Sequence, residues 1–217
     1  MTPRQLIVTT ILACFCALPI VAQKQAKMAS IFVQTPEELI PALNQDLKSD
    51  LVEQYYDRTD TELRNLYNGP CRITKITDSY LRLELDSTMV VEFKQLGGRW
   101  FRPKYYGMSV TSTISPALSV LSFFDTKWAP IPRSSMVALP EPEQFLITPA
   151  DSIRLDYKKA RIEREVWEYV ATFDPDRPTL TFRISAFDEP LAKKQHPTVP
   201  QLLKEITYRW RHNRFVH

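Results

Sequence analysis

Regular alternation of apolar and polar residues constrains the fold of this chain more than any other feature. Leu81, Leu83 and Leu85 alternate with Arg82 and Glu84. Successive side chains of a β-strand point to opposite faces of a sheet, so this pattern predicts a strand with one buried face and one face in water. The same period of two recurs through the rest of the chain and predicts a fold dominated by sheet.

Eight segments carry this strand pattern or a short apolar run, and the short polar turns between several of them favour antiparallel neighbours. The segment from Leu118 to Phe124 is apolar on both faces, which predicts a central strand covered on both sides. The last strand directs Ile206, Tyr208 and Trp210 inward, so the chain is expected to end inside the sheet. The predicted strands are 72–77, 80–85, 89–94, 105–113, 118–125, 161–173, 179–185 and 206–211.

Helix signals precede the strands. Thr35, Pro36 and Glu38 supply an N-cap hydroxyl, a proline at the first helical position and a carboxylate three residues after the cap, which predicts a helix start. Pro41 removes an amide donor and ends that helix. Further helical segments are predicted at 46–56, starting near Asn44, and at 61–67. The sequence therefore predicts an α+β fold, with N-terminal helices packed on a mostly antiparallel sheet of about seven to eight strands.

The N-terminus has the order of properties of a secretory leader. Arg4 precedes an uncharged apolar run from Leu6 to Ala22 that contains Pro19. The run is about 17 residues long, at the lower limit of the ~17 to 25 residues of a membrane-spanning helix. We therefore expect residues 1–22 to be a cleaved signal peptide. Residues 23–217 are expected to form a single periplasmic or secreted α+β domain with no integral membrane segment.

A second interpretation of the leader centres on Cys14. The segment Ile11 to Cys14 resembles a lipoprotein box, in which a lipid on the cysteine tethers the protein to a membrane. The residues after Cys14 stay apolar through Ala22, which favours the cleaved signal peptide instead. Once the leader is removed, Cys71 is the remaining cysteine, so no intramolecular disulfide is expected.

Charge gives no indication of a nucleic-acid partner. The net charge is +3 for the full sequence, and loss of the leader with its one arginine reduces it by one. The tail from Tyr208 to Phe215 combines basic and aromatic residues, which superficially suggests a stacking surface for bases. Alternation explains it better, with Tyr208 and Trp210 in the core and Arg209 and Arg211 in water.

Residues 126–160 contain five prolines and are predicted to form a long connection with little regular pairing. A loop of this length is either a packed surface loop or a binding loop. Trp128, Met136, Leu139 and Phe145 are apolar anchors within it, which favours the packed loop. The connection also allows two lobes within the domain.

Six segments resemble the recurring blocks of a known family. They are Ile31–Pro41, Leu47–Tyr56, Ile76–Leu81, Phe123–Trp128, Leu180–Phe182 and Tyr208–Trp210. In these segments the chain is similar to an uncharacterised secreted Bacteroidales family, classed as a domain of unknown function. The resemblance implies export and a continuous fold through the mature chain. It implies no site residues, because the blocks are structural in character.

No group of residues predicts catalysis or a cofactor. His196, His212 and His217 lie far from any serine or cysteine in a nucleophile-elbow setting, and are expected to be solvated. No pair of histidines or cysteines has the spacing of metal ligands, and no glycine-rich loop is present to cradle phosphates. We therefore assign no catalytic, cofactor-binding or metal-binding residues from the sequence.

Acidic residues leave a hydrolase open as an alternative. Asp57, Asp60 and Glu62 form the densest acidic group, but they lack the further oxygens and the glycine bend of a calcium loop. Acids on separate strands can meet in space and act as a pair for glycoside hydrolysis. The acids on strand-like segments, most of which are expected to face water, are Glu84, Glu92, Glu163, Glu165 and Glu168.

These observations favour a non-enzymatic envelope protein, a binding or interaction module that presents a sheet face or the 126–160 loop to a protein or glycan partner. One alternative is a carboxylate-dependent hydrolase of cell-envelope material, which requires two acids about 5 to 9.5 Å apart. The other is an inhibitor-like regulatory module.

Overall fold

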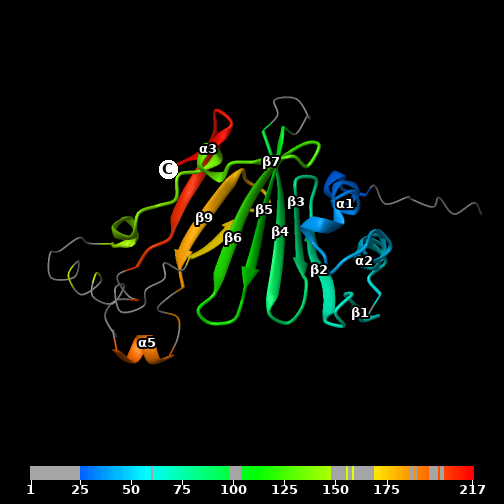
Figure 1. The fold of residues 1–217 in the computed structure, drawn as a ribbon, viewed down its shortest axis with the longest axis horizontal. Helices are drawn as coiled ribbons and strands as arrows, with labels where there is room; N and C mark the ends of the chain where they lie inside the picture. The colour runs from blue at the N-terminus through cyan, green and yellow to red at the C-terminus, as the bar shows by residue number, and fades with distance from the viewer. Residues whose placement is uncertain are drawn as a thin grey trace, which may run out of the picture.

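Seven strands form the larger of two sheets. The computed structural model describes residues 25–59, 61–97, 104–147, 155, 158, 169–185, 188, 190–195, 200 and 203–217. The seven strands follow one another across the sheet in sequence order, and each pairs antiparallel with the next (Figure 1). They are β1 (Leu63–Arg64), β2 (Pro70–Ile76), β3 (Tyr80–Glu84), β4 (Met89–Leu96), β5 (Tyr105–Ser112), β6 (Leu118–Asp125) and β7 (Pro130–Ile131).

The smaller sheet has four antiparallel strands in the order β11-β10-β9-β8. These are β8 (Tyr169–Phe173), β9 (Thr179–Ile184), β10 (Ile206–Arg211) and β11 (Arg214–Val216). The predicted α+β class with antiparallel pairing is confirmed, but the strands divide between two sheets where one was expected. Strand β7 explains the division, because Pro130 within it and Pro132 after it lack the amide donors that another strand would need.

The helices are short except for one. They are α1 (Lys27–Val33), η1 (Glu37–Leu39), α2 (Gln45–Asp57), α3 (Arg133–Met136), η2 (Pro142–Phe145) and α5 (Pro190–Gln195). Helix α2 matches the predicted 46–56 segment, and Asn44 caps it by accepting a hydrogen bond from the amide of Leu47 at 2.9 Å. Within the part of the chain that the structure describes, none of the helices is both long and apolar enough to cross a membrane.

Two helical predictions were wrong. Thr35 does not start a helix: its hydroxyl donates to the carbonyl of Ile31, and its own carbonyl accepts from Nζ of Lys48 at 2.6 Å. The hydroxyl of Thr35 thus bonds to the end of α1, a helix that the sequence did not predict. Only the single turn η1 follows. The predicted turn at 61–67 is instead strand β1 and a tight turn, because Asn65 bonds to the carbonyl of Gly69 and closes a hairpin.

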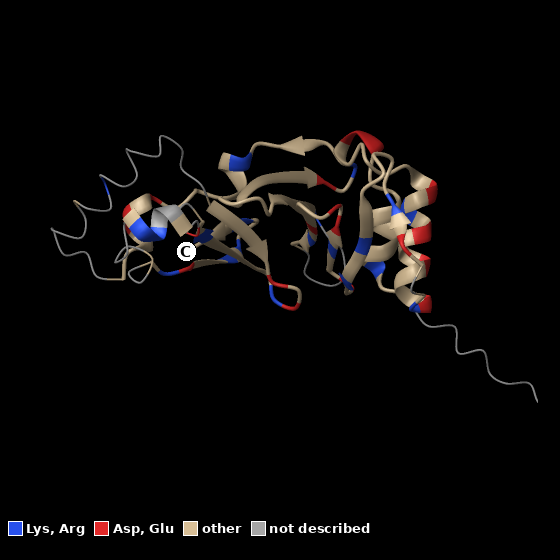
Figure 2. Cartoon of the chain, turned by 90° about the horizontal axis from the view of Figure 1, so that it is seen from below, with Lys and Arg blue, Asp and Glu red and all other residues tan. Residues whose placement is uncertain are grey.

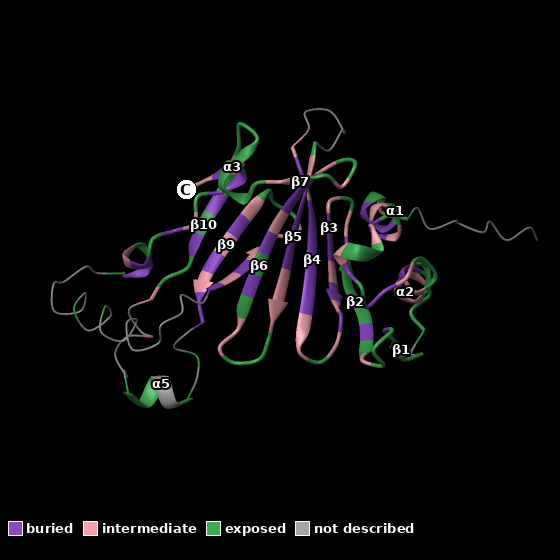
Figure 3. Ribbon diagram, in the orientation of Figure 1, coloured by how far each residue is buried: buried purple, intermediate pink, exposed green. Residues whose placement is uncertain are grey.

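The large sheet separates two apolar cores. Helices α1 and α2 pack on one face, where Phe32 and Leu51 meet Leu81 and Phe93. The small sheet, α3 and the β7–η2 connection pack on the other face (Figure 3). The buried aromatic residues of this second core are Tyr80, Phe123, Phe145, Tyr169, Phe173, Phe182, Tyr208 and Phe215. Strand β4 is therefore buried along most of its length.

Strand β6 is covered on one face only over its first half. Leu121 and Phe123 are buried in the second core, but Leu118 and Val120 are 40% and 59% exposed on the opposite face. The prediction of a doubly covered strand was wrong here, because α1 and α2 contact β3 and β2 and leave this end of the sheet open. Exposed Leu118 and Val120 cannot be distinguished from buried residues by their apolar character alone.

The described part of the proline-rich connection, up to residue 147, is packed against the protein. Met136 and Phe145 are buried in the second core, Leu139 packs against it, and Trp128 packs against the first core. All four predicted anchors therefore make apolar contacts. The C-terminus also ends in the sheet as predicted, with one further strand, β11, that places Phe215 in the core. Residues 161–168 of the predicted 161–173 strand lie outside the described residues.

Gly107 lies at a close approach of the two sheets. A Cβ atom at this position would lie 2.7 Å from Cζ of Phe173 and 3.2 Å from Cδ1 of Leu96. Both neighbours are almost fully buried, so neither has open space into which to move. The absence of a side chain on β5 thus allows β8 to pack directly on the large sheet.

We expect Gly107→Ala to lower the free energy of unfolding by about 1–3 kcal/mol, because the added methyl group overpacks this contact. Urea denaturation of the variant measures the loss. Ser122→Ala on neighbouring β6, a half-exposed position without a close contact, is the control and is expected to change stability by less than about 0.5 kcal/mol. Equal stability of Gly107→Ala and the wild type would contradict the proposed close approach.

Candidate functional site

Among the described strands, β8 pairs only with β9, so its other edge carries backbone groups that need hydrogen-bond partners. Side chains rising from the large sheet supply them. Ser119 Oγ accepts from the amide of Ala171 at 2.9 Å, and Ser109 Oγ donates to the carbonyl of Ala171 at 2.7 Å. Glu92 Oε2 accepts from the amide of Phe173 at 3.0 Å. These buried polar contacts join the two sheets.

Lys94 continues the row at the end of β8. Its Nζ donates to the carbonyls of Asp174 and Pro175, at 2.7 and 2.9 Å, and to Oγ of Ser79 at 3.2 Å. Burial lowers the pKa of Lys94 to about 8, and the nearby charges of Asp174 and Asp176 oppose that shift. We call Glu92, Lys94, Ser109 and Ser119 the polar seam.

Glu92 is the most heavily bonded member of the polar seam. Its Oε1 accepts from the hydroxyl of Tyr80 at 2.8 Å and from Nη1 of Arg82 at 2.7 Å, in addition to the Phe173 amide on Oε2. Burial raises the pKa of Glu92, while these hydrogen bonds and the Arg82 charge lower it. The expectation that Glu92 faces water was wrong: its side chain is 3% exposed. Strand alternation placed it correctly on the face opposite Val91, but a second sheet covers that face.

A cavity of about 400 Å³ lies beside the polar seam, where the outer face of the small sheet meets the large sheet. Two arginines line it, one from each sheet: Arg82 on β3 and Arg183 on β9. Arg82 pairs with Glu92, and Arg183 pairs with Asp188, each arginine side chain being about two-fifths exposed. The remaining lining residues are small, Val90, Thr111, Thr113, Ser115, Ala117, Val170 and Thr172. The cavity is therefore rich in hydroxyl and guanidinium groups.

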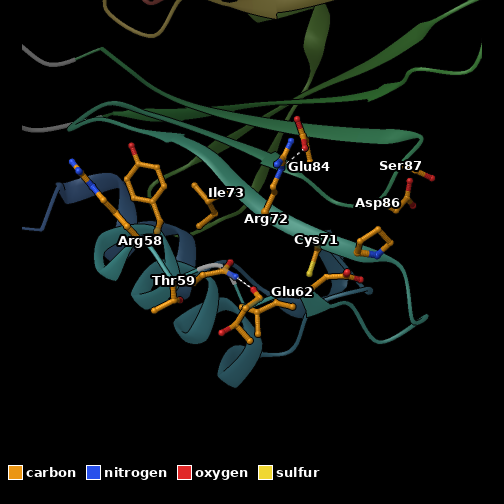
Figure 4. A pocket seen from close by; sticks show the side chains of 14 residues that line it. Arg58, Thr59, Glu62, Cys71, Arg72, Ile73, Glu84, Asp86 and Ser87 are labelled. Atoms are coloured by element: carbon orange, nitrogen blue, oxygen red, sulfur yellow. Dashed lines mark hydrogen bonds and ion pairs between the residues drawn. The ribbon is translucent and has the colours of Figure 1, made fainter.

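A second and wider cavity, of about 580 Å³, lies between the end of α2 and strands β1 to β3 (Figure 4). It holds three acids, and each has a partner. Glu62 pairs with Arg64 and Glu84 with Arg72, both at 2.6 Å, while Asp86 accepts from the amide of Thr88 at 2.6 Å. The carboxyl groups of this cavity are thus engaged by neighbouring protein groups.

Cys71 also lines this wider cavity and is labelled in Figure 4. Burial raises the pKa of the Cys71 thiol to about 11. The thiolate is the reactive form of cysteine, so at neutral pH this side chain is a poor nucleophile. The cavity between the two sheets, most of whose lining residues lie on strands, is the better candidate for a binding site.

The other residues considered from the sequence do not converge. His212 is exposed in the turn between β10 and β11, and the His217 ring lies 5.5 Å from the ring of Tyr208. Asp57 belongs to the exposed acidic face of α2, which stands out in Figure 2. Three or more metal-ligating side chains do not gather anywhere in the described ranges. His196, Asp60, Glu163, Glu165 and Glu168 lie outside the described residues.

The basic tail has the alternation that the sequence predicted. Tyr208 is buried and Trp210 packs against the second core, while Arg209 and Arg211 are exposed. Sequence reasoning missed Arg183 and the two seam serines. Ser109 and Ser119 carry a weak signal, since each is a small polar residue on a buried face of a largely apolar strand. Arg183 carries none, because an arginine on an alternating strand usually faces water.

The buried position of Lys94 predicts a dependence of stability on pH. Its pKa is lower in the folded protein than in the unfolded chain, so between about pH 8 and 10 the unfolded chain binds more protons. Lys94 therefore contributes a rise in the free energy of unfolding with pH across this window, whereas Cys71, with its raised pKa of about 11, contributes a fall near the upper end. Lys94→Met is expected to abolish that rise and to cost about 1–3 kcal/mol at pH 7, because two carbonyls lose their donor.

Urea denaturation at pH 7, 8, 9 and 10 measures both effects, and the window stops where tyrosines begin to ionise in the unfolded chain. Lys75→Met, at an exposed position on β2, is the matched control and should keep the wild-type slope. A slope that survives in Lys94→Met would show that another group causes it.

Comparison with known proteins places the chain in a family. A family described as "Protein of unknown function (DUF3256)" matches residues 20–215. A solved structure described as "Structure of a domain of an uncharacterized protein from Porphyromonas gingivalis W83" is similar in fold, with a TM-score of 0.73 and 18% identity, over 88% of this chain and 99% of that one. No curated protein matches. The chain therefore belongs to the DUF3256 family of proteins of unknown function.

Proposed function

We propose that this chain is a non-enzymatic binding protein of the cell envelope, exported to the periplasm or secreted, and that it binds a glycan or a similar polar ligand in the cavity between its two sheets. The observation that carries this proposal is the lining of the cavity. Hydroxyl and guanidinium groups face it, while the carboxyl of Glu92 is fully engaged by its own donors.

The walls of the cavity suit recognition of a ligand without large rearrangement. Thr111 and Arg82 project from central strands of the large sheet, and Thr172 and Arg183 project from two paired strands of the small sheet. Side chains on strands are positioned more accurately than side chains on loops. The polar seam fixes the angle between these walls, so the polar groups are arranged before a ligand arrives.

The alternative of a carboxylate hydrolase requires a protonated acid and a second carboxylate across a cleft. Two of the described residues that line the cavity are acids, and both are bonded to arginine: Glu92 to Arg82 and Asp188 to Arg183. Burial raises the pKa of Glu92, but both of its oxygens already accept hydrogen bonds from protein groups, so neither is open to a substrate. The hydrolase and the inhibitor-like module remain alternatives, and the two outcomes below separate the hydrolase from a binding protein.

Filling the cavity is expected to abolish ligand binding. Thr172→Trp places a large side chain in the space between the sheets, whereas Thr207→Trp, at an exposed position of the same sheet outside the cavity, is the matched control. Retention on immobilised envelope glycans measures binding. We expect the wild type and Thr207→Trp to be retained. Free glycan should elute Thr172→Trp at a concentration at least about tenfold lower. Equal retention of the two tryptophan variants would overturn the assignment of the cavity.

The same glycans serve as substrates in a test for hydrolysis. Incubation with wild-type protein is expected to release no new reducing ends. Release that disappears in Glu92→Gln, with circular dichroism showing an intact fold, would favour the hydrolase instead.

Export is tested at the N-terminus of the mature protein. The order of charge, apolar run and small residue predicts cleavage after Ala22, so the fractionated protein should begin at Gln23. Mass spectrometry of the periplasmic and secreted fractions gives this terminus directly. A chain that begins at a lipidated Cys14 would support membrane tethering, and a chain that keeps residues 1–22 would contradict export by a cleaved signal.

A further inference from the structure

Arg183 has hydrogen-bonding capacity that the described residues do not use. Its Nη1 donates to Oδ2 of Asp188 and, at 3.4 Å, to the carbonyl of Ile184. A guanidinium carries five N–H donors in a planar fork, so the Nε and Nη2 side of Arg183 has no acceptor among the residues that the structure describes. The side chain is 40% exposed and lines the cavity between the sheets. Donors of this kind remain available to a ligand.

Three hydroxyl groups in the cavity are also without partners. The side chains of Thr113, Ser115 and Thr172 line it and make no hydrogen bond within the described ranges, whereas Thr111 is bonded to Ser119 at 2.7 Å. Hydroxyls accept and donate, so they match the hydroxyls of a ligand. None of the described residues that line the cavity is aromatic, so the contacts that these residues offer a sugar are polar.

The acids of the cavity leave one acceptor beside these donors. Both oxygens of Glu92 already accept hydrogen bonds from Tyr80, Arg82 and the Phe173 amide, and the carboxyl is almost fully buried. Asp188 is bonded through Oδ2 to Nη1 of Arg183, so its Oδ1 remains as an acceptor. The unused capacity of the described walls therefore consists of the Nε and Nη2 donors of Arg183, three hydroxyls and this one acceptor, and the donors and hydroxyls together match a carboxylate joined to hydroxyls.

We propose that the cavity between the sheets selects ligands that join a carboxylate to a hydroxylated ring, as a uronic acid unit of a glycan does. The free side of Arg183 binds the carboxylate, and Thr113, Ser115 and Thr172 bind the ring hydroxyls. This inference rests on the proposed function and names the chemistry that the binding site recognises. The two-pronged geometry of guanidinium and carboxylate explains why an arginine suits this position.

The test compares two sugars that differ mainly at one carbon, glucuronate and glucose, by isothermal titration calorimetry with the full mature chain. We expect glucuronate to bind at least about tenfold more tightly than glucose, because a charge-assisted pair adds to the same hydroxyl contacts. Raising the salt concentration should weaken glucuronate binding and leave glucose binding unchanged.

Arg183→Gln removes the charge but keeps a polar side chain, and it is expected to weaken glucuronate binding about tenfold to hundredfold with no effect on glucose. Arg209→Gln, on β10 of the same sheet and outside the cavity, makes the same change in net charge and should bind as the wild type does. Unfolding midpoints of both variants verify that they fold.

Equal binding of the two sugars, or unchanged glucuronate binding in Arg183→Gln, would overturn the acidic-ligand inference while the proposed binding function stands. If the wild type is retained on envelope glycans but binds neither sugar, the acidic-ligand inference fails and the proposed binding function stands. If the wild type is not retained and binds neither sugar, both the inference and the proposed function fail.

Discussion

The unpaired edge of β8 is the constraint on which the rest of this structure depends. A strand with one free edge invites further pairing, and proteins usually pair it, charge it or cover it. Here side chains of the large sheet take the place of a neighbouring strand: Ser109 and Ser119 bond to Ala171, and Glu92 bonds to Phe173. The small sheet therefore docks by its edge and does not lie flat on the large sheet. That edge-on docking leaves a corner, and the corner is the cavity.

Burying these polar groups has an energetic cost, which only complete hydrogen bonding offsets. Glu92 and Lys94 satisfy this condition, because each has three hydrogen-bond partners. Apolar residues could hold two sheets together with similar free energy, but they would permit several registers. The hydrogen bonds are made at Ala171, at Phe173 and at the turn that follows. We infer that they specify the position of β8 along the large sheet, and that Gly107 sets the distance between β8 and that sheet.

Sequence patterns predicted the strands well and their assembly poorly. Alternation located β3, β9 and β10 within a residue, because one face of each is apolar and the other is polar. The same rule assigns Glu92 and Ser109 to a face in water, and their burial comes from β8, more than sixty residues further along the chain. No sequence feature near Glu92 indicates its contact with β8. The candidate site was missed for the same reason, since Arg82 and Arg183 meet only after the two sheets have packed together.

The polar seam also bears on how the cavity can function. A site for acid catalysis needs a carboxyl that gains and loses a proton during each turnover, with at least one oxygen open to substrate. In Glu92, Oε1 accepts from two donors and Oε2 from a backbone amide that belongs to the interface itself. Proton exchange at this carboxyl would thus disturb the contact that orients the two sheets. A structural carboxyl needs both oxygens bonded within the protein, whereas a catalytic carboxyl needs one open to substrate. The hydrogen bonds of Glu92 fit the structural role. The recognition chemistry is then carried by groups without a structural role, the free side of Arg183 and the unpartnered hydroxyls around it.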